Sequence, residues 1–193
     1  YDVAKNKTIY LNITDFTDER YLTNVTWSPD SKTIYIQVMN REQKELNLNA
    51  YDALTGEFKA TLLSEKNDQF LEPNRPLIFI DDDRFVYTTD NRDGYYNLYL
   101  YSLKKNQLTR LTRVNADVEY LDHDNKYVYY YSAEVSSAER HLCRVNIATG
   151  KSVRLTRAEG WHQCQLSTDK RYFTDNYSSL NVPRVVAVGS TVG

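Results

Sequence analysis

The chain has 193 residues and a net charge of −2, from 24 basic and 26 acidic side chains. This length suits one domain or a piece of a larger one, and the charge balance argues against a nucleic-acid-binding face, which needs a basic excess. Two cysteines exclude a disulfide-rich scaffold, and the sequence contains neither an apolar run long enough to span a membrane nor the pattern of a signal peptide.

Alternating apolar and polar residues predict a series of strands along the chain. Tyrosine, which favours strands, occurs 17 times. The pattern of a strand, a polar turn and a second strand occurs, in chain order, at residues 1–11, 51–62, 101–112, 145–156 and, less completely, 182–190. The middle three segments turn at Thr55-Gly56, Lys105-Asn106 and Thr149-Gly150, which is typical of β-hairpins.

A second motif precedes the hairpins and consists of an apolar residue, an Asp-rich turn and an aromatic strand. It occurs at residues 27–36, 79–88, 121–130 and 166–175. Four short strands in a repeat of about 40–50 residues are typical of a β-propeller blade. Residues 40–46 and 133–142 lack a sustained helical period, so we interpret them as connections.

The repeat predicts an all-β partial propeller with about fourteen to sixteen strands. Complete four-stranded blades are expected at residues 21–62, 68–112 and 113–156, with partial blades at both ends. Because the chain starts and stops within blades, we expect it to be an excised piece of a larger propeller. We also expect the cut edges near residues 8–13 and 160–188 to pair with a second copy of the chain as a homodimer.

Four longer segments carry a family resemblance: residues 25–56, 72–101, 136–146 and 159–186. Their motifs WSPD, RDGYYNLY and YSSLNVP, in this order, resemble the dipeptidyl peptidase IV family of serine exopeptidases in the prolyl oligopeptidase superfamily. The similarity is greatest to bacterial members, especially those of Bacteroidetes. It implies that the parent protein has an eight-bladed propeller above a C-terminal α/β-hydrolase domain. Residues 1–193 would then run from the end of the fourth blade to most of the eighth.

The resemblance also implies a function for the parent protein. Such an enzyme releases X-Pro or X-Ala dipeptides from peptide N-termini in the periplasm or at the cell surface. Its propeller limits access of the peptide substrate, and its hydrolase domain is the propeller's partner. The alternative is a stand-alone propeller of the TolB or WD40 type that binds proteins. A G-x-S-x-G motif in the downstream reading frame would favour the enzyme.

We expect no catalytic residue in the chain itself. None of its six glycines frames a serine with G-x-S-x-G spacing. No two glutamates are adjacent, and the resemblance places the family's paired glutamates upstream of Tyr1. Gly150-Lys151-Ser152 resembles the end of a phosphate-binding loop but lacks the glycine five residues earlier. We therefore expect no cofactor.

The candidate substrate-binding residues are Phe70, Leu71 and Glu72. They lie in residues 69–76, which align with a propeller loop that faces the active site in the family, and Pro73 and Pro76 match its pattern. The family's Arg–Phe–Arg run is absent here. The alternative is an ordinary loop between blades.

The remaining polar motifs have structural interpretations. Asp81–Asp83 and Asp122–Asp124 lack the ligand spacing of a calcium loop and are interpreted as solvated turns. The three histidines lack the spacing of a zinc site and are expected at the surface or an interface. Cys143 and Cys164 are either buried free thiols or a disulfide between neighbouring blades. The tyrosine runs are interpreted as packing between sheets rather than as a stacking surface for ligands.

Overall fold

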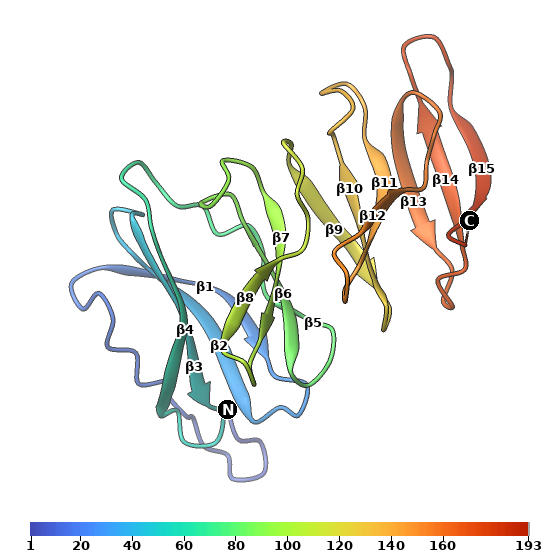
Figure 1. Ribbon diagram of the computed structural model, residues 1–193. Coiled ribbons are helices and arrows are strands. Elements are labelled where there is room, and N and C mark those ends of the chain that lie inside the picture. Colours follow the sequence, from blue (N-terminus) through green and yellow to red (C-terminus); the bar gives the residue numbers. More distant parts are fainter. Residues whose placement is uncertain (193) are drawn as a thin grey trace. The chain divides into compact units, whose positions relative to one another are not determined.

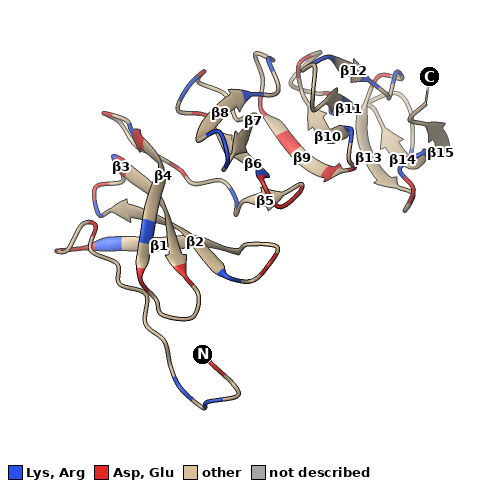
Figure 2. Cartoon of the chain, turned by 60° about the horizontal axis from the view of Figure 1, so that its bottom comes forward, with Lys and Arg blue, Asp and Glu red and all other residues tan. Residues whose placement is uncertain are grey.

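The computed structural model describes residues 1–192, which form fifteen strands in four antiparallel sheets (Figure 1). The all-β prediction and the predicted strand number are both confirmed. Within the described residues, no helix is present that is long and apolar enough to cross a membrane. Basic and acidic residues are interspersed along the chain (Figure 2).

The sheets follow one another along the chain, and in each the strands are neighbours in sequence order. Sheet I contains β1 (Arg20–Trp27), β2 (Thr33–Asn40), β3 (Glu45–Asp52) and β4 (Phe58–Lys66). Sheet II contains β5 (Ile78–Phe79), β6 (Arg84–Thr89), β7 (Asn97–Ser102) and β8 (Gln107–Arg110). Sheet III contains β9 (Val118–His123), β10 (Tyr127–Ser132), β11 (His141–Asn146) and β12 (Ser152–Arg154). Sheet IV contains β13 (Trp161–Leu166), β14 (Tyr172–Ser178) and β15 (Val185–Ser190).

Side-chain acceptors set the hairpin turns that the sequence predicted. The carboxylate of Asp52 accepts the backbone N–H groups of Leu54 and Thr55 at 2.9 and 3.0 Å, and Gly56 follows with a φ of 77°. Asn146 and Gly150 occupy the same positions between β11 and β12. A polar residue that captures the turn N–H groups, followed by a glycine at positive φ, therefore defines both hairpins.

The Asp-rich motifs form turns of the expected kind. Before β2, the hydroxyl of Ser28 donates to Asp30 at 2.7 Å and accepts the N–H of Thr33 at 2.9 Å. Ser167 and Asp169 repeat this arrangement before β14, with a hydroxyl-to-carboxylate distance of 2.7 Å. These short side chains satisfy backbone groups locally, which fixes where each central strand begins.

The chain divides into two compact units. Unit 1 comprises residues 1–91 and 100–108, and unit 2 comprises residues 92–99 and the chain from Thr109 onward. Sheet I lies in unit 1, sheets III and IV lie in unit 2, and the strands of sheet II are shared between the two.

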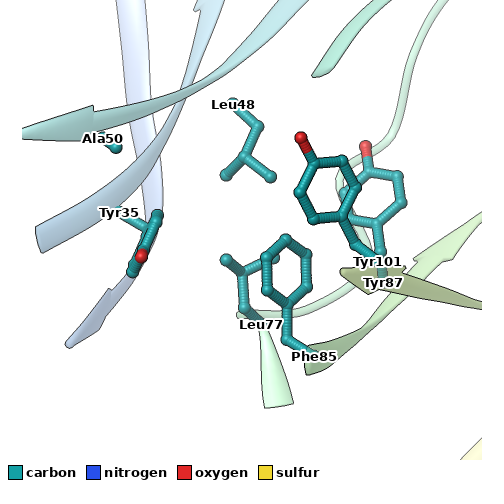
Figure 3. Close-up of a cluster of buried hydrophobic side chains, with 7 residues drawn as sticks. All are labelled: Tyr35, Leu48, Ala50, Leu77, Phe85, Tyr87 and Tyr101. Atoms are coloured by element: carbon teal, nitrogen blue, oxygen red, sulfur yellow. The ribbon is translucent and has the colours of Figure 1, made fainter. Parts of the chain in front are cut away.

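An aromatic cluster forms the core of unit 1. Phe85 is completely buried, and its ring stacks on Tyr101 with centroids 5.0 Å apart. Phe79 meets Phe85 edge to face at 5.4 Å. Figure 3 shows the buried members of this cluster, which come from strands of sheets I and II and, for Leu77, from the residue before β5: Tyr35, Leu48, Ala50, Leu77, Phe85, Tyr87 and Tyr101. The prediction that tyrosines serve packing between sheets is confirmed here.

The expected strand pair over residues 1–11 is wrong. This segment contains only one isolated bridge, between Asp2 and Lys7. Farther on, Leu11, Ile13 and Phe16 pack against a buried cluster on sheet I. Apolar burial on an existing sheet thus takes the place of a second hairpin strand. The segment is held against the β3–β4 turn by the N–H of Asn12, which donates to the carbonyl of Gly56 at 2.8 Å.

Unit 2 is built around the contact between sheets III and IV. The register pairs Tyr131 with Leu142, and both side chains pack with Cys164 and Phe173 of sheet IV. The start of β11 also meets the start of β13 in a parallel bridge between Arg140 and Trp161. Side-chain packing and main-chain hydrogen bonds therefore both join these sheets.

Candidate functional site

The predicted substrate-binding loop lies in unit 1, between β4 and β5. The loop is attached to the β2–β3 turn, because the N–H of Leu71 donates to the carbonyl of Gln43 at 2.6 Å. The Leu71 side chain is 4% exposed and packs with Met39 and Leu46. Leu71 therefore anchors the loop through its side chain and does not present that side chain to a ligand.

The other two candidates are differently placed. Phe70 is 57% exposed, and Glu72 is exposed at the edge of a small cavity of about 10 Å³. Below this cavity Glu65 is buried, and its carboxylate accepts hydrogen bonds from Tyr87 at 3.2 Å and Thr89 at 2.9 Å. Substrate binding by Phe70, Leu71 and Glu72 stays a prediction, for which only Phe70 and Glu72 present accessible side chains.

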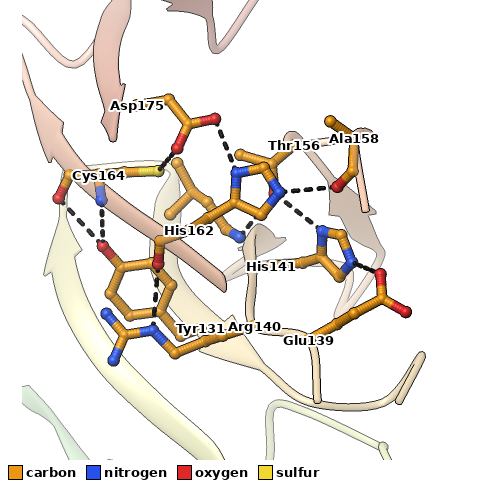
Figure 4. Close-up of polar contacts among 10 residues, drawn as sticks. Tyr131, Glu139, Arg140, His141, Thr156, Ala158, His162, Cys164 and Asp175 are labelled. Atoms are coloured by element: carbon orange, nitrogen blue, oxygen red, sulfur yellow. Dashed lines mark hydrogen bonds and ion pairs between the residues drawn. The ribbon is translucent and has the colours of Figure 1, made fainter. Parts of the chain in front are cut away.

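A second group of polar and ionisable residues lies in unit 2 between sheets III and IV (Figure 4). The sequence analysis did not predict that these residues meet. Asp175 on β14 is 7% exposed and holds two neighbours. Its Oδ2 lies 2.8 Å from Nδ1 of His162, and its Oδ1 accepts the thiol of Cys164 at 3.4 Å. A cysteine, a histidine and an acid thus meet at one buried point.

The positions of the hydrogens follow from the partners of His162. Its Nε2 lies 2.8 Å from the carbonyl oxygen of Ala158, which can only accept, so Nε2 carries a hydrogen. Its Nδ1 faces the Asp175 carboxyl group. The ring is further held by stacking on Tyr177 at 4.7 Å.

His141 lies beside His162, with ring centroids 5.1 Å apart, but its partners differ. Its Nε2 donates to Glu139 at 3.0 Å, and its Nδ1 lies 3.2 Å from the hydroxyl of Thr156, which can donate. Burial lowers the pKa of His141, which favours the neutral ring. The neutral tautomer satisfies both of its nitrogens.

This arrangement does not make a nucleophile. The thiol of Cys164 donates to a carboxylate rather than to a histidine, and burial together with the charge of Asp175 raises its pKa far above the ordinary value. Burial also raises the pKa of Cys143 to about 12. Because the thiolate is the reactive form, neither cysteine is activated. Both are free thiols on different sheets, which leaves the disulfide alternative without support.

The geometry instead joins two sheets. The carbonyl of Cys164 accepts the Tyr131 hydroxyl at 3.0 Å, and its N–H lies 2.6 Å from the same oxygen. Arg140 covers the Tyr131 ring at 3.8 Å and donates to the carbonyl of His162 at 3.2 Å. The Tyr131 and Arg140 contacts join sheet III to sheet IV, whereas Asp175 joins the neighbouring strands β13 and β14 of sheet IV.

Local contacts show the surroundings of two histidines and of the Asp81 turn. His141 and His162 are buried between sheets, so the surface alternative is wrong for them, and the interface alternative holds. Asp81 bonds Arg84 at 2.8 Å and accepts backbone N–H groups, as expected of a turn. Among residues 1–192, no group of three acidic, histidine or cysteine side chains could hold a metal ion.

Asp175 is the residue that sequence reasoning missed. The available signal was the alternation of His162 and Cys164 on β13, which places both side chains on one face of a strand. The β13–β14 register then sets Asp175 directly opposite Cys164. The β13–β14 register depends on the length of the turn between these strands, and the sequence alone did not define that length.

The buried thiols give a direct prediction. Cys143 and Cys164 are expected to resist iodoacetamide at about pH 8 while the protein is folded, because their raised pKa values keep them protonated and burial blocks access. Mass spectrometry of the two cysteine peptides measures this, with the urea-unfolded protein as the positive control. Rapid labelling of either residue in the folded protein would contradict the assignment.

Comparisons with known proteins agree with this geometry. The family described as the dipeptidyl peptidase IV (DPP IV) N-terminal region matches residues 1–184. The chain belongs to this family of dipeptidyl peptidase IV N-terminal regions. Its four successive antiparallel sheets are those of a partial β-propeller.

Two solved structures and one fungal relative illustrate the similarity. A dipeptidyl peptidase 4 of Porphyromonas gingivalis matches 99% of the chain with a TM-score of 0.83 and 25% identity. A candidate dipeptidyl aminopeptidase IV from Bacteroides ovatus matches 99% with a TM-score of 0.83 and 30% identity. A probable dipeptidyl peptidase 4 of Aspergillus flavus is 27% identical over 82% of the chain. The chain spans 27%, 30% and 22% of these three proteins, respectively.

Proposed function

We propose that the chain is the non-catalytic propeller portion of a serine exopeptidase that releases X-Pro or X-Ala dipeptides from peptide N-termini. Its role is to limit which peptides reach a hydrolase domain elsewhere in the protein. The observation that carries this proposal is the family match over residues 1–184, supported by similarity to solved dipeptidyl peptidases. This match favours a peptidase over a stand-alone protein-binding propeller.

The chemistry of the buried groups supports a structural role. Cys164, His162 and Asp175, the residues most able to support catalysis, face one another inside the contact between two sheets. A rigid wall is what an access-limiting propeller requires, since it excludes large substrates by shape. The exposed Phe70 and Glu72 are the residues proposed to meet the peptide, and an extracytoplasmic location belongs to the same proposal.

A homodimer through unpaired sheet edges also remains a proposal. Among the described residues, β15 pairs only with β14, so its other edge is open, and Val186 and Val188 on this strand are exposed. Open strand edges are sites of pairing with other chains. Residues 8–13 are not the segment that fills this position within the chain, because they lie along sheet I.

Hydrolysis of a Gly-Pro chromogenic substrate tests the proposed function. The whole protein is expected to release the chromophore in a reaction that a serine-directed inhibitor stops, whereas purified residues 1–193 are expected to release none. Absence of turnover by the whole protein would overturn the peptidase assignment. Inhibitor-sensitive turnover by residues 1–193, in proportion to their concentration, would show that the chain holds a nucleophile.

A further inference from the structure

A pocket in unit 2 lies on the face of sheet III that turns away from sheet IV. The register pairs Tyr130 with Cys143 and Cys143 with Arg154, so these three side chains share one face. The contact with sheet IV uses the opposite face, which carries Tyr131 and Leu142. The pocket shares His141 with the polar cluster, where the His141 ring lies 5.1 Å from that of His162, but its other lining residues lie outside that cluster.

The pocket has a volume of about 300 Å³, at the low end of the range for small-molecule sites. Its floor is buried and is formed by Tyr130, Ser132, His141 and Cys143. Its rim is exposed and is formed by Glu134, Val135, Ser152, Val153 and Arg154. A buried floor with an open rim leaves room for a ligand of the size of an amino acid or a dipeptide.

Two opposite charges on the rim have no partner. Glu134 lies in the connection between β10 and β11, and Arg154 lies at the end of β12. Within residues 1–192, neither the carboxylate nor the guanidinium forms an ion pair or a side-chain hydrogen bond, although both line the same pocket. Elsewhere, on the lining of a pocket in unit 1, Glu19 is paired with Arg41 at 3.2 Å.

The other lining residues add no charge to the pocket. His141 is already satisfied by Glu139 and Thr156, so it adds no free charge. The rim residues Val135 and Val153 supply apolar surface. A ligand with an ammonium group for Glu134, a carboxylate for Arg154 and a small apolar side chain would satisfy each part of the lining.

We propose that this pocket on sheet III binds a small zwitterion, of amino-acid or dipeptide size, whose ammonium group pairs with Glu134 and whose carboxylate pairs with Arg154. An anion held by Arg154 alone, or a cation held by Glu134 alone, would satisfy only one of the two charges. The site goes beyond the proposed peptidase function, because it lies on the propeller sheet and needs no catalytic group.

Isothermal titration calorimetry on the whole protein tests the site, with glycyl-valine as the probe. We expect saturable binding below about 10 mM and a loss of about tenfold or more in affinity for both Glu134→Gln and Arg154→Gln, since each removes one charge-assisted contact. N-acetyl-glycyl-valine lacks the ammonium group, and glycyl-valinamide lacks the carboxylate. Each should bind the unmodified protein as weakly as glycyl-valine binds the two variants.

Glu19→Gln and Arg41→Gln are the matched controls, because they make the same changes at an exposed ion pair of unit 1 and should leave binding unchanged. Absence of saturable binding to the unmodified protein would overturn the proposal. Equal binding by Glu134→Gln and Arg154→Gln would also overturn it, because the probe would then occupy another site, such as the peptide site of the proposed enzyme. The readout is binding, so it does not depend on whether the protein hydrolyses peptides.

Discussion

Replacing Asp175 with alanine is expected to lower the free energy of unfolding by about 3 kcal/mol, because two buried side chains lose their hydrogen-bond acceptor at once. His162 would lose the acceptor 2.8 Å from its Nδ1, and the Cys164 thiol would lose its acceptor at 3.4 Å. Neither side chain can turn to water, since both are buried between sheets III and IV.

Urea unfolding of the variant beside the unmodified protein measures this loss. Asp175→Asn keeps one acceptor oxygen and should lose roughly half as much stability. Asp68→Ala is the matched control, because Asp68 is exposed, and it should change stability by less than about 0.5 kcal/mol. If Asp175→Ala unfolded at the same urea concentration as Asp68→Ala, the hydrogen bonds of Asp175 to His162 and Cys164 would not stabilise the fold.

Replacing Phe85 with alanine is expected to cost about 3–5 kcal/mol, the range for a buried phenylalanine whose cavity cannot collapse. The Phe85 ring lies 5.0 Å from Tyr101, 5.4 Å from Phe79 and 6.3 Å from Tyr35, measured between centroids. Its removal would therefore take one packing partner from each of three aromatic neighbours.

Phe85→Leu keeps most of the buried volume and should lose clearly less stability than the alanine variant. Phe70→Ala is the control for the same chemical change at a side chain that is 57% exposed, and its effect should lie within about 0.5 kcal/mol. Thermal or urea unfolding compares the three variants. A Phe85→Ala protein as stable as Phe70→Ala would show that the aromatic cluster is not the core of unit 1.

The repeat of the sheets could be predicted because local signals set it. Asp52 with Gly56, and Asn146 with Gly150, build the same turn from residues that are close in sequence. The strands between such turns alternate with period two, so their number and order follow. Residues 1–11 misled the prediction, since Tyr1, Val3 and Tyr10 alternate with polar residues but stay exposed, and only the chain from Leu11 onward packs on sheet I.

The polar cluster of unit 2 could not be predicted from spacing. His141, His162 and Asp175 come from three strands of two sheets, and no local motif connects them. His162 and Asp175 meet through the pairing of β13 with β14, and His141 joins them only because sheet III packs on sheet IV, which is a long-range outcome. For the loop at Phe70, the sequence indicated the segment, but only the structure separates the buried Leu71 from its exposed neighbours.

The central claim is that the buried chemistry of this chain is structural and that catalysis takes place elsewhere in the protein. The most direct test is kcat/KM for a Gly-Pro chromogenic substrate, measured per folded molecule of the whole protein with and without Asp175→Asn. The two values are expected to agree within about twofold, because Asp175 is buried and its carboxylate is held by His162 and Cys164 of the neighbouring strand. A loss of about a hundredfold or more at an unchanged folded fraction, the size expected for a lost acid or base, would contradict the claim.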